Sequence, residues 1–249
     1  MKKSSLLLLI VFSIKSLYAV DNDIILEEKF PKKLSDFHFF KDTHAQIPSN
    51  GVVPYELISS LFSDYSYKQR WVYIPEGKKA SFRKDKVFDF PVGSALIKTF
   101  YYPVDERDLS IGKKLLETRL LLRKTNGWEA VSYAWNESQN EAIIKKAGKT
   151  IITDWIDFKG ESRSVRYRVP NKNQCKECHS NNDAVMPIGP KARNLNKVYD
   201  YQDESINQLT KWMKLDYIDN IQTDLNTPVD WEDDNHSLEE RVRSYLDIN

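Results

Sequence analysis

Cysteine is scarce in this chain: the 249 residues include only Cys175 and Cys178. Two thiols separated by two residues cannot cross-link distant segments, so a disulfide framework of the small secreted type is excluded. A charge excess is also absent, since 37 Lys and Arg residues face 36 Asp and Glu residues. Broad electrostatic binding to nucleic acid or to an anionic membrane surface is therefore not expected. The length is sufficient to bury a core.

Long hydrophobic runs are missing beyond the N-terminus. The run "LLLLIVFSI" follows Lys2 and Lys3 and precedes Ala19. It is too short to cross a bilayer of about 30 Å, and no other segment approaches the ~20 apolar residues that a span needs. We predict that residues 1–19 are a signal peptide and that the mature protein is soluble in the bacterial periplasm. Because Lys15 and Leu17 depart from the preferred pattern, an uncleaved N-terminal anchor stays open as the alternative.

The rest of the chain divides by pattern into an N-terminal arm (20–69), a strand-rich region (70–170), a cysteine-containing segment with helices (171–225) and a C-terminal helix (226–249). Short strands separated by Gly or Pro turns favour an antiparallel sheet or sandwich. The best alternation places Val165, Tyr167 and Val169 on one side of a strand, with Arg166 and Arg168 on the other. The expected class is mainly β with a helical C-terminal part, an α+β fold.

Three helices are expected outside the strands, over residues 136–148, 203–215 and 237–249. Each prediction uses a start signal or an apolar stripe: Asn136 with Gln139 for the first, Ile206 with Leu209 and Met213 for the second, Ser237 with Glu240 for the third.

The two cysteines stand in the string Cys175-Lys-Glu-Cys178-His179. A Cys-x-x-Cys-His string is the attachment signal for haem c. Thiols at this spacing can form thioethers with the two vinyl groups of one porphyrin, and the next residue can place an imidazole on the iron. The alternatives are a thiol-disulfide redox pair, a zinc site and a chance string. Zinc would need two more ligands from His38, His44, His236 or carboxylates, and a redox pair would be expected in a βαβ unit.

Further haem contacts are expected downstream. The stretch "MPIGPKARNLN" is similar to the loop of small cytochromes c, and by that likeness Gly189, Pro190 and Leu195 would orient the ring of His179. A plain Gly-Pro turn is the alternative. Met213 is far enough along the chain to be the distal ligand, although its helical stripe is typical of a core residue. An open sixth position is the other possibility, and Arg166 and Arg168 are candidates for pairing with the propionates.

The segments "LFSDYSYKQRWVYIPEG", "FPVGSALIKTFYYP", "VPNKNQCKECHS" and "PIGPKARNLN" together resemble a family of bacterial envelope di-haem c-type cytochromes. The resemblance runs from about Leu34 to Asn249 and implies covalent haem on Cys175 and Cys178. In that family a segment similar to "RVRSYLDIN" continues into a second Cys-x-x-Cys-His domain, whereas this sequence stops at Asn249. Either the chain is truncated or the first haem functions alone, and the unfinished amphipathic helix at the end favours truncation.

A weaker likeness concerns the order of the strands, the Gly-Trp hairpin at Gly127 and the haem motif. This order is similar to sheet-based cytochromes c-prime and to hydroxylamine-oxidising cytochromes with a lysine-linked haem, and it would bring Lys98 near the ring. A strand lysine needs no such role.

Two functions are weighed on these residues. An electron-transfer cytochrome would meet redox partner proteins and the haem-attachment machinery. A haem enzyme or gas-binding protein would act on hydroxylamine, nitric oxide or peroxide at an open iron. A domain that retains no haem is a third possibility.

Overall fold

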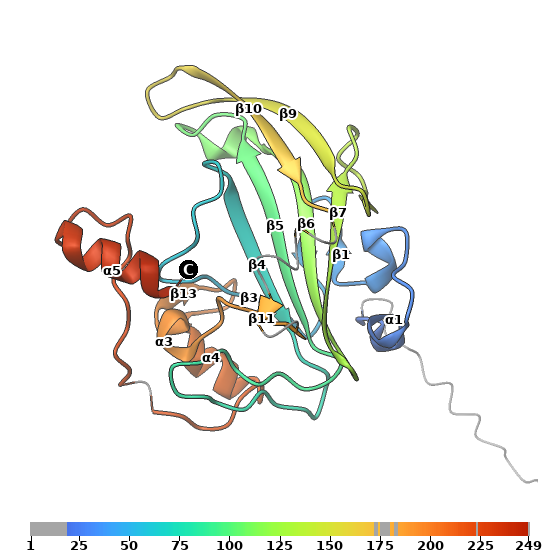
Figure 1. Cartoon of the computed structure of the whole chain (residues 1–249), viewed down its shortest axis with the longest axis vertical. Helices are drawn as coiled ribbons and strands as arrows, with labels where there is room; N and C mark the ends of the chain where they lie inside the picture. Colours follow the sequence, from blue (N-terminus) through green and yellow to red (C-terminus); the bar gives the residue numbers. More distant parts are fainter. Residues whose placement is uncertain (1–18, 172–173, 175–179, 182–183, 223, 249) are drawn as a thin grey trace, which may run out of the picture.

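A six-stranded antiparallel sheet forms the centre of this computed structural model, which describes residues 19–171, 174, 180–181, 184–222 and 224–248 (Figure 1). In sheet order the strands are β3 (Val52–Pro54), β4 (Tyr67–Tyr73), β5 (Ala95–Pro103), β6 (Lys113–Lys124), β7 (Gly127–Trp135) and β8 (Ala142–Ile144). Strands make up 38% of the structure and helices 16%, which confirms the prediction of a mainly β, antiparallel fold.

Side chains alternate between the two faces of the sheet, as the pleat requires. On one face Trp71 lies opposite Ile97, and Ile97 opposite Leu120; we call it the arm face. On the other face Arg70 lies opposite Lys98, and Lys98 opposite Arg119; we call it the hairpin face. The strongly apolar strands are explained by this arrangement, because both faces are covered by other segments.

The N-terminal segment covers the arm face and lies on one side of the sheet in Figure 1. It contains α1 (Asn22–Leu26), the 3₁₀ helix η1 (Leu34–Phe37), β1 (Phe40–Asp42) and β2 (Ile47–Pro48). Phe37 has no exposed surface; its ring stacks on Phe39 at 5.1 Å and meets the ring of Tyr133 edge-on at 6.0 Å. The arm therefore shares one aromatic core with the sheet.

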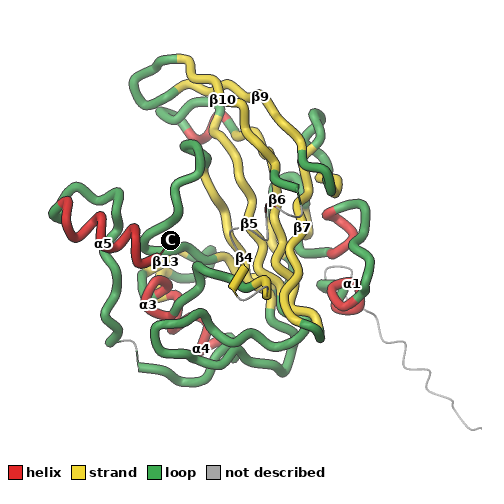
Figure 2. The backbone as a smooth tube through the Cα atoms, viewed as in Figure 1, coloured by secondary structure: helices red, strands yellow, loops and turns green. Residues whose placement is uncertain are grey.

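The hairpin face is covered at its two ends by different elements (Figure 2). At one end lie α3 (Ala192–Leu195) and α4 (Gln208–Lys214); at the other lies the hairpin of β9 (Lys149–Ile156) and β10 (Ser162–Val169). The helix cluster consists of Val72, Phe88, Phe90, Leu96, Leu195, Leu209 and Trp212 with their neighbours. The hairpin cluster consists of Phe100, Tyr102, Leu116, Ala134, Trp155, Tyr167 and Val169.

The remaining elements are short, except for the C-terminal helix. They are η2 (Leu109–Ile111), β11 (Ser180–Asn181), β12 (Ala184–Val185), β13 (Val198–Asp200), β14 (Ser205–Asn207) and α5 (Leu238–Ile248). Within the described part of the chain, no helix has the length and apolar character that a bilayer crossing requires.

The helix predicted over residues 136–148 is wrong. Residues 136–141 form the turn that returns the chain from β7 to β8, residues 142–144 are β8, and residues 145–148 connect β8 to β9. The Asn136 side chain accepts a hydrogen bond from the Asn140 N–H at 3.2 Å, and Gln139 adopts a φ of 57° while its amide pairs with the backbone of Leu115. The same side-chain acceptor that caps a helix can also close a turn, so the start signal was ambiguous.

The two later helix predictions fare better. Residues 208–214 are helical, but Ile206 belongs to β14 rather than to the helix. Helix α5 starts at the predicted capping box: the Glu240 N–H donates to Ser237 Oγ at 3.3 Å, and Ser237 donates to the Glu240 carboxylate at 2.7 Å. The alternation in β10 is confirmed as well, since Tyr167 and Val169 are buried while Arg166 and Arg168 are exposed.

Candidate functional site

The haem-attachment string, Cys175, Cys178 and His179, lies outside the described residues, and so does the predicted signal peptide up to residue 18. The chain on either side of the string is described. Upstream, Val169 is fully buried in the hairpin cluster. Downstream, β11 pairs with β12, which lies against β7. Both flanks are therefore fixed beside the sheet.

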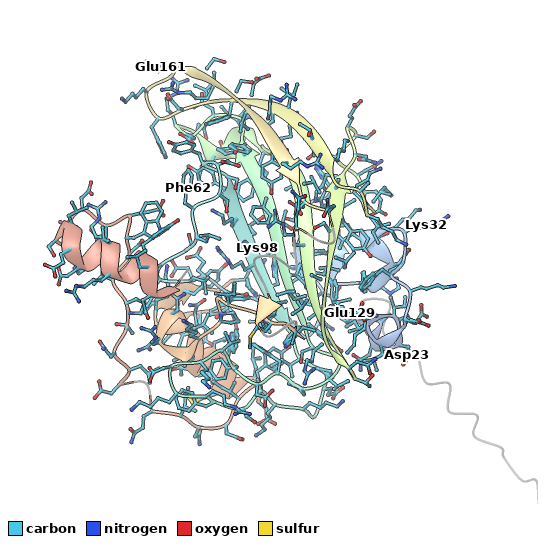
Figure 3. The ribbon with its side chains drawn as sticks, in the orientation of Figure 1. Asp23, Lys32, Phe62, Lys98, Glu129 and Glu161 are labelled. Atoms are coloured by element: carbon cyan, nitrogen blue, oxygen red, sulfur yellow. The ribbon has the colours of Figure 1, made fainter. Side chains whose placement is uncertain are left out.

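Three cations stand side by side on the hairpin face. Arg70, Lys98 and Arg119 come from the neighbouring strands β4, β5 and β6 and lie directly opposite one another in register. We call them the cationic row. Directly opposed side chains in a sheet have their Cβ atoms about 5 Å apart. The row crosses the sheet between the hairpin cluster and the helix cluster, and Figure 3 labels Lys98 near its middle.

Arg119 is held by a buried carboxylate. Its Nε and Nη2 donate to the two oxygens of Glu117 at 2.7 and 3.0 Å, and the Tyr167 hydroxyl donates to the same carboxylate at 2.8 Å. Glu117 has no exposed surface. Burial and the Glu117 charge raise the pKa of Tyr167, so this hydroxyl stays protonated and keeps donating.

Arg70 and Lys98 have fewer polar partners among the described residues than Arg119 has. Arg70 is only 7% exposed, and its Nη2 is buried without a hydrogen-bond partner among the described residues. The Lys98 ammonium lies 4.7 Å from the centre of the Phe100 ring, and the Arg119 guanidinium lies 4.4 Å from the same ring. Burial, together with the charges of Arg70 and Arg119, holds the pKa of Lys98 well below its ordinary value.

A cavity leads from the surface to one end of the row. Its volume is about 580 Å³, and Lys68 and Arg70 line it together with Phe62, Tyr65 and Trp231. Tyr65 is 72% exposed and packs edge-on against Phe62 at 5.0 Å, so aromatic side chains form the rim. Burial and the nearby Arg70 lower the pKa of Lys68 to about 8. The row is thus accessible at its β4 end.

Of the three residues predicted to orient His179, Gly189 and Pro190 lie just before α3 and Leu195 is its last residue. Leu195 is fully buried in the helix cluster, and the buried Pro190 accepts a hydrogen bond from the Phe88 N–H at 3.3 Å through its carbonyl. Gly189 packs tightly, since a Cβ there would lie 2.9 Å from Leu57. These residues connect the segment after the haem motif to the helix cluster, and their relation to His179 stays a prediction.

The predicted distal ligands lie in several places. Met213 packs against the helix cluster, and its Sδ accepts a hydrogen bond from the Ile221 N–H at 3.4 Å. His38 and His44 are exposed on the N-terminal segment, and His236 stands 3.8 Å from Asp233 before α5. Over the described ranges, no three His, Cys, Asp or Glu side chains gather in a way that could hold a metal ion.

The arginines first considered for the propionates differ from those of the row. Arg166 and Arg168 point outward from β10, and Arg168 donates to Thr150 at 3.3 Å. Arg70 and Arg119 were missed by the sequence analysis. The available signal was a single cation inside each of the strand segments "QRWVY", "ALIKTF" and "LETRLLL", but only the register shows that these cations meet.

Comparison with protein-family models, curated proteins and solved structures finds no match for this chain.

Proposed function

We propose that this protein is an exported c-type cytochrome of the periplasm that carries one covalent haem and transfers electrons. The observation that carries the proposal is the Cys-x-x-Cys-His string, which uses both thiols of the chain and adds an iron ligand directly after them. Cys175 and Cys178 would form the thioethers and His179 the proximal bond to iron. The sequence likeness to envelope di-haem cytochromes supports the same assignment.

The described surroundings suit such a group. A haem has an apolar ring and two carboxylates, and it needs partners of both kinds. The hairpin face offers two apolar clusters with cations between them, including an arginine nitrogen for which the described ranges supply no hydrogen-bond partner. The flanks of the motif are fixed beside this sheet. The donor set therefore fits a haem.

The haem and the residues of the chain would have different roles. The haem supplies a one-electron redox centre. The chain would attach it through two thiols, ligate it through His179, bury its ring and neutralise its carboxylates, which together set the potential. Redox proteins would dock transiently, and the haem-attachment machinery would load the chain after export. Gly189, Pro190 and Leu195 would hold the proximal side through the tight packing at Leu57 and Phe88.

The test is co-expression of the full chain with haem-attachment machinery. A pyridine haemochrome spectrum should show one haem per chain, and the haem should stay with the protein through denaturing electrophoresis. The Cys175→Ala, Cys178→Ala double variant should lose covalent haem, while Met213→Leu should keep it. Covalent haem in the double variant, or none in the wild type, would refute the assignment.

A second candidate is a haem enzyme or gas-binding protein with an open distal position. The observation that favours it is the placement of Met213, whose sulfur is engaged in the helix cluster. Visible spectra separate the two functions. Low-spin bands that ignore carbon monoxide indicate electron transfer, whereas high-spin bands shifted by carbon monoxide indicate reaction with hydroxylamine, nitric oxide or peroxide.

A further inference from the structure

We propose that the cationic row, Arg70, Lys98 and Arg119, is a binding site for a carboxylate group. The carboxylate would come from a haem propionate or from a small free carboxylate that enters through the cavity at β4. Only the first source rests on the proposed function.

The charges of the cationic row favour an anionic ligand. Like charges that oppose one another directly across strands destabilise a sheet. Among the described residues, three cations, Arg70, Arg119 and Lys68, lower the pKa of Lys98 electrostatically, and one carboxylate, Glu117, raises it. That carboxylate already binds Arg119 and Tyr167. An added anion would relieve the remaining repulsion.

A buried hydrogen-bond donor of Arg70 also favours a carboxylate ligand. A buried polar atom without a partner costs about 1–3 kcal/mol, and more when it is charged. Within the part of the chain that the structure describes, Arg70 Nη2 is such an atom, in a side chain that is only 7% exposed. A guanidinium is well suited to a carboxylate because its N–H groups form a planar fork. Arg70 also lines the cavity, so a ligand can reach it.

The position of the row between two apolar clusters indicates the kind of carboxylate that it would bind. Apolar clusters lie on both sides of it, and Phe100, 1% exposed, separates it from the hairpin. The lysine and arginine nearest to Phe100 both lie over its ring, which keeps their charged ends on this face. The site therefore favours a carboxylate on an apolar body over a hydrated inorganic ion.

The test uses the full chain in two forms, made with and without haem-attachment machinery. For each form the thermal midpoint is measured against succinate concentration, with sodium chloride at equal ionic strength as the reference. We expect a saturable rise in the haem-free form. Arg70→Met and Lys98→Met should raise the midpoint without succinate, because repulsion is removed. Each should also increase the half-saturating succinate concentration about tenfold or more, as loss of a charge-assisted hydrogen bond implies.

Arg243→Met is the control, since Arg243 lies on α5 outside the row and has 78% of its side chain exposed. It should leave both the midpoint and the succinate response unchanged. A residue with a merely structural role would destabilise the protein when replaced, so the opposite signs of the two effects identify a ligand site.

The haem-loaded form distinguishes the sources. If a propionate occupies the row, succinate has no effect there, and Arg70→Met and Lys98→Met lower the reduction potential because a cation near the iron is lost. If the ligand is free, the loaded form still responds to succinate. The proposal is overturned if neither form shows a saturable response and both row variants behave like Arg243→Met. If the chain takes up no haem, the electron-transfer function fails while the haem-free response still tests the row.

Discussion

Glu117 is completely buried, yet its carboxylate accepts hydrogen bonds from Arg119 and Tyr167. It is the buried counter-charge that the structure shows for the cationic row. Removing one partner of a buried ion pair leaves the other charge without compensation. Glu117 therefore stabilises the fold through the same cations that form the candidate site.

We predict that Glu117→Leu lowers the free energy of unfolding by about 3 kcal/mol, at the lower end of the range for buried pairs because Arg119 keeps 34% of its side chain exposed. Urea denaturation measures the change. Glu161→Leu is the control: the Glu161 side chain is 60% exposed beside Arg163, and the change should stay below about 1 kcal/mol. Equal effects of the two variants would contradict the prediction.

Lys68 gives the stability of the protein a pH dependence. Burial and Arg70 lower its pKa to about 8, against an ordinary value of 10.5. Between these two values the unfolded chain binds more protons than the folded chain, so the free energy of unfolding rises with pH. Compared with Lys68→Met, the wild type should gain stability between about pH 7 and about pH 9.5.

Urea denaturation at the two pH values measures this difference. Lys159→Met, on the exposed turn of the β9–β10 hairpin, should keep the wild-type pH dependence. If Lys68→Met also keeps it, Lys68 does not carry the effect.

At the scale of elements, the turn before β9 decides how the β9–β10 hairpin ends. Gly148 has a φ of +75°, and a Cβ there would lie 2.6 Å from the Val169 carbonyl oxygen. Val169 is the last residue of β10, two residues from the start of the undescribed stretch that leads into the haem motif. A side chain at Gly148 would therefore displace the end of β10.

We predict that Gly148→Ala destabilises the protein clearly more than Gly77→Ala. Gly77 has a similar φ of +72°, but nothing lies within 4 Å of its Cβ position, so only the backbone cost of about 1 kcal/mol applies. Urea midpoints of the two variants test this. In the haem-loaded protein, Gly148→Ala should also lower haem content, whereas Gly77→Ala should not; equal behaviour would show that the close approach to Val169 is unimportant.

Strands were more predictable than turns. The apolar strands and the alternation in β10 could be predicted because they depend on the hydrophobicity of each residue and not on its distant contacts. The stretch 136–148 was misassigned because Asn136 serves a helix cap and a turn equally well, and the partner that decides, the backbone of Leu115, is 24 residues from Gln139. The candidate site also depends on distant contacts. The three cations can be read from the sequence, but the strand register that places them side by side cannot.

At the scale of the whole molecule, the N-terminal arm and the sheet share one core on the arm face. Phe37 connects them through Phe39 and Tyr133. We predict that Phe37→Ala lowers the free energy of unfolding by about 3–5 kcal/mol, the cost of emptying a buried phenylalanine site. The loss should appear equally in tryptophan fluorescence and in far-ultraviolet circular dichroism, because arm and sheet unfold together.

Phe62→Ala is the control for this prediction, since Phe62 is 41% exposed at the rim of the cavity and should have a much smaller effect. Two separate transitions in the wild type, one for the arm and one for the sheet, would contradict the shared core.

The contacts of the arm also fix an order of events during synthesis. Ser35 donates to Glu141, 106 residues later, and Pro31 accepts from Tyr133, 102 residues later. The arm is made first, and these two contacts can form only after β7 and β8 have left the ribosome. Contacts at such sequence separation form slowly. Because residues are added at about 5–20 per second, synthesis delays the closure of these contacts by several seconds, a delay compatible with the export that we propose for this chain.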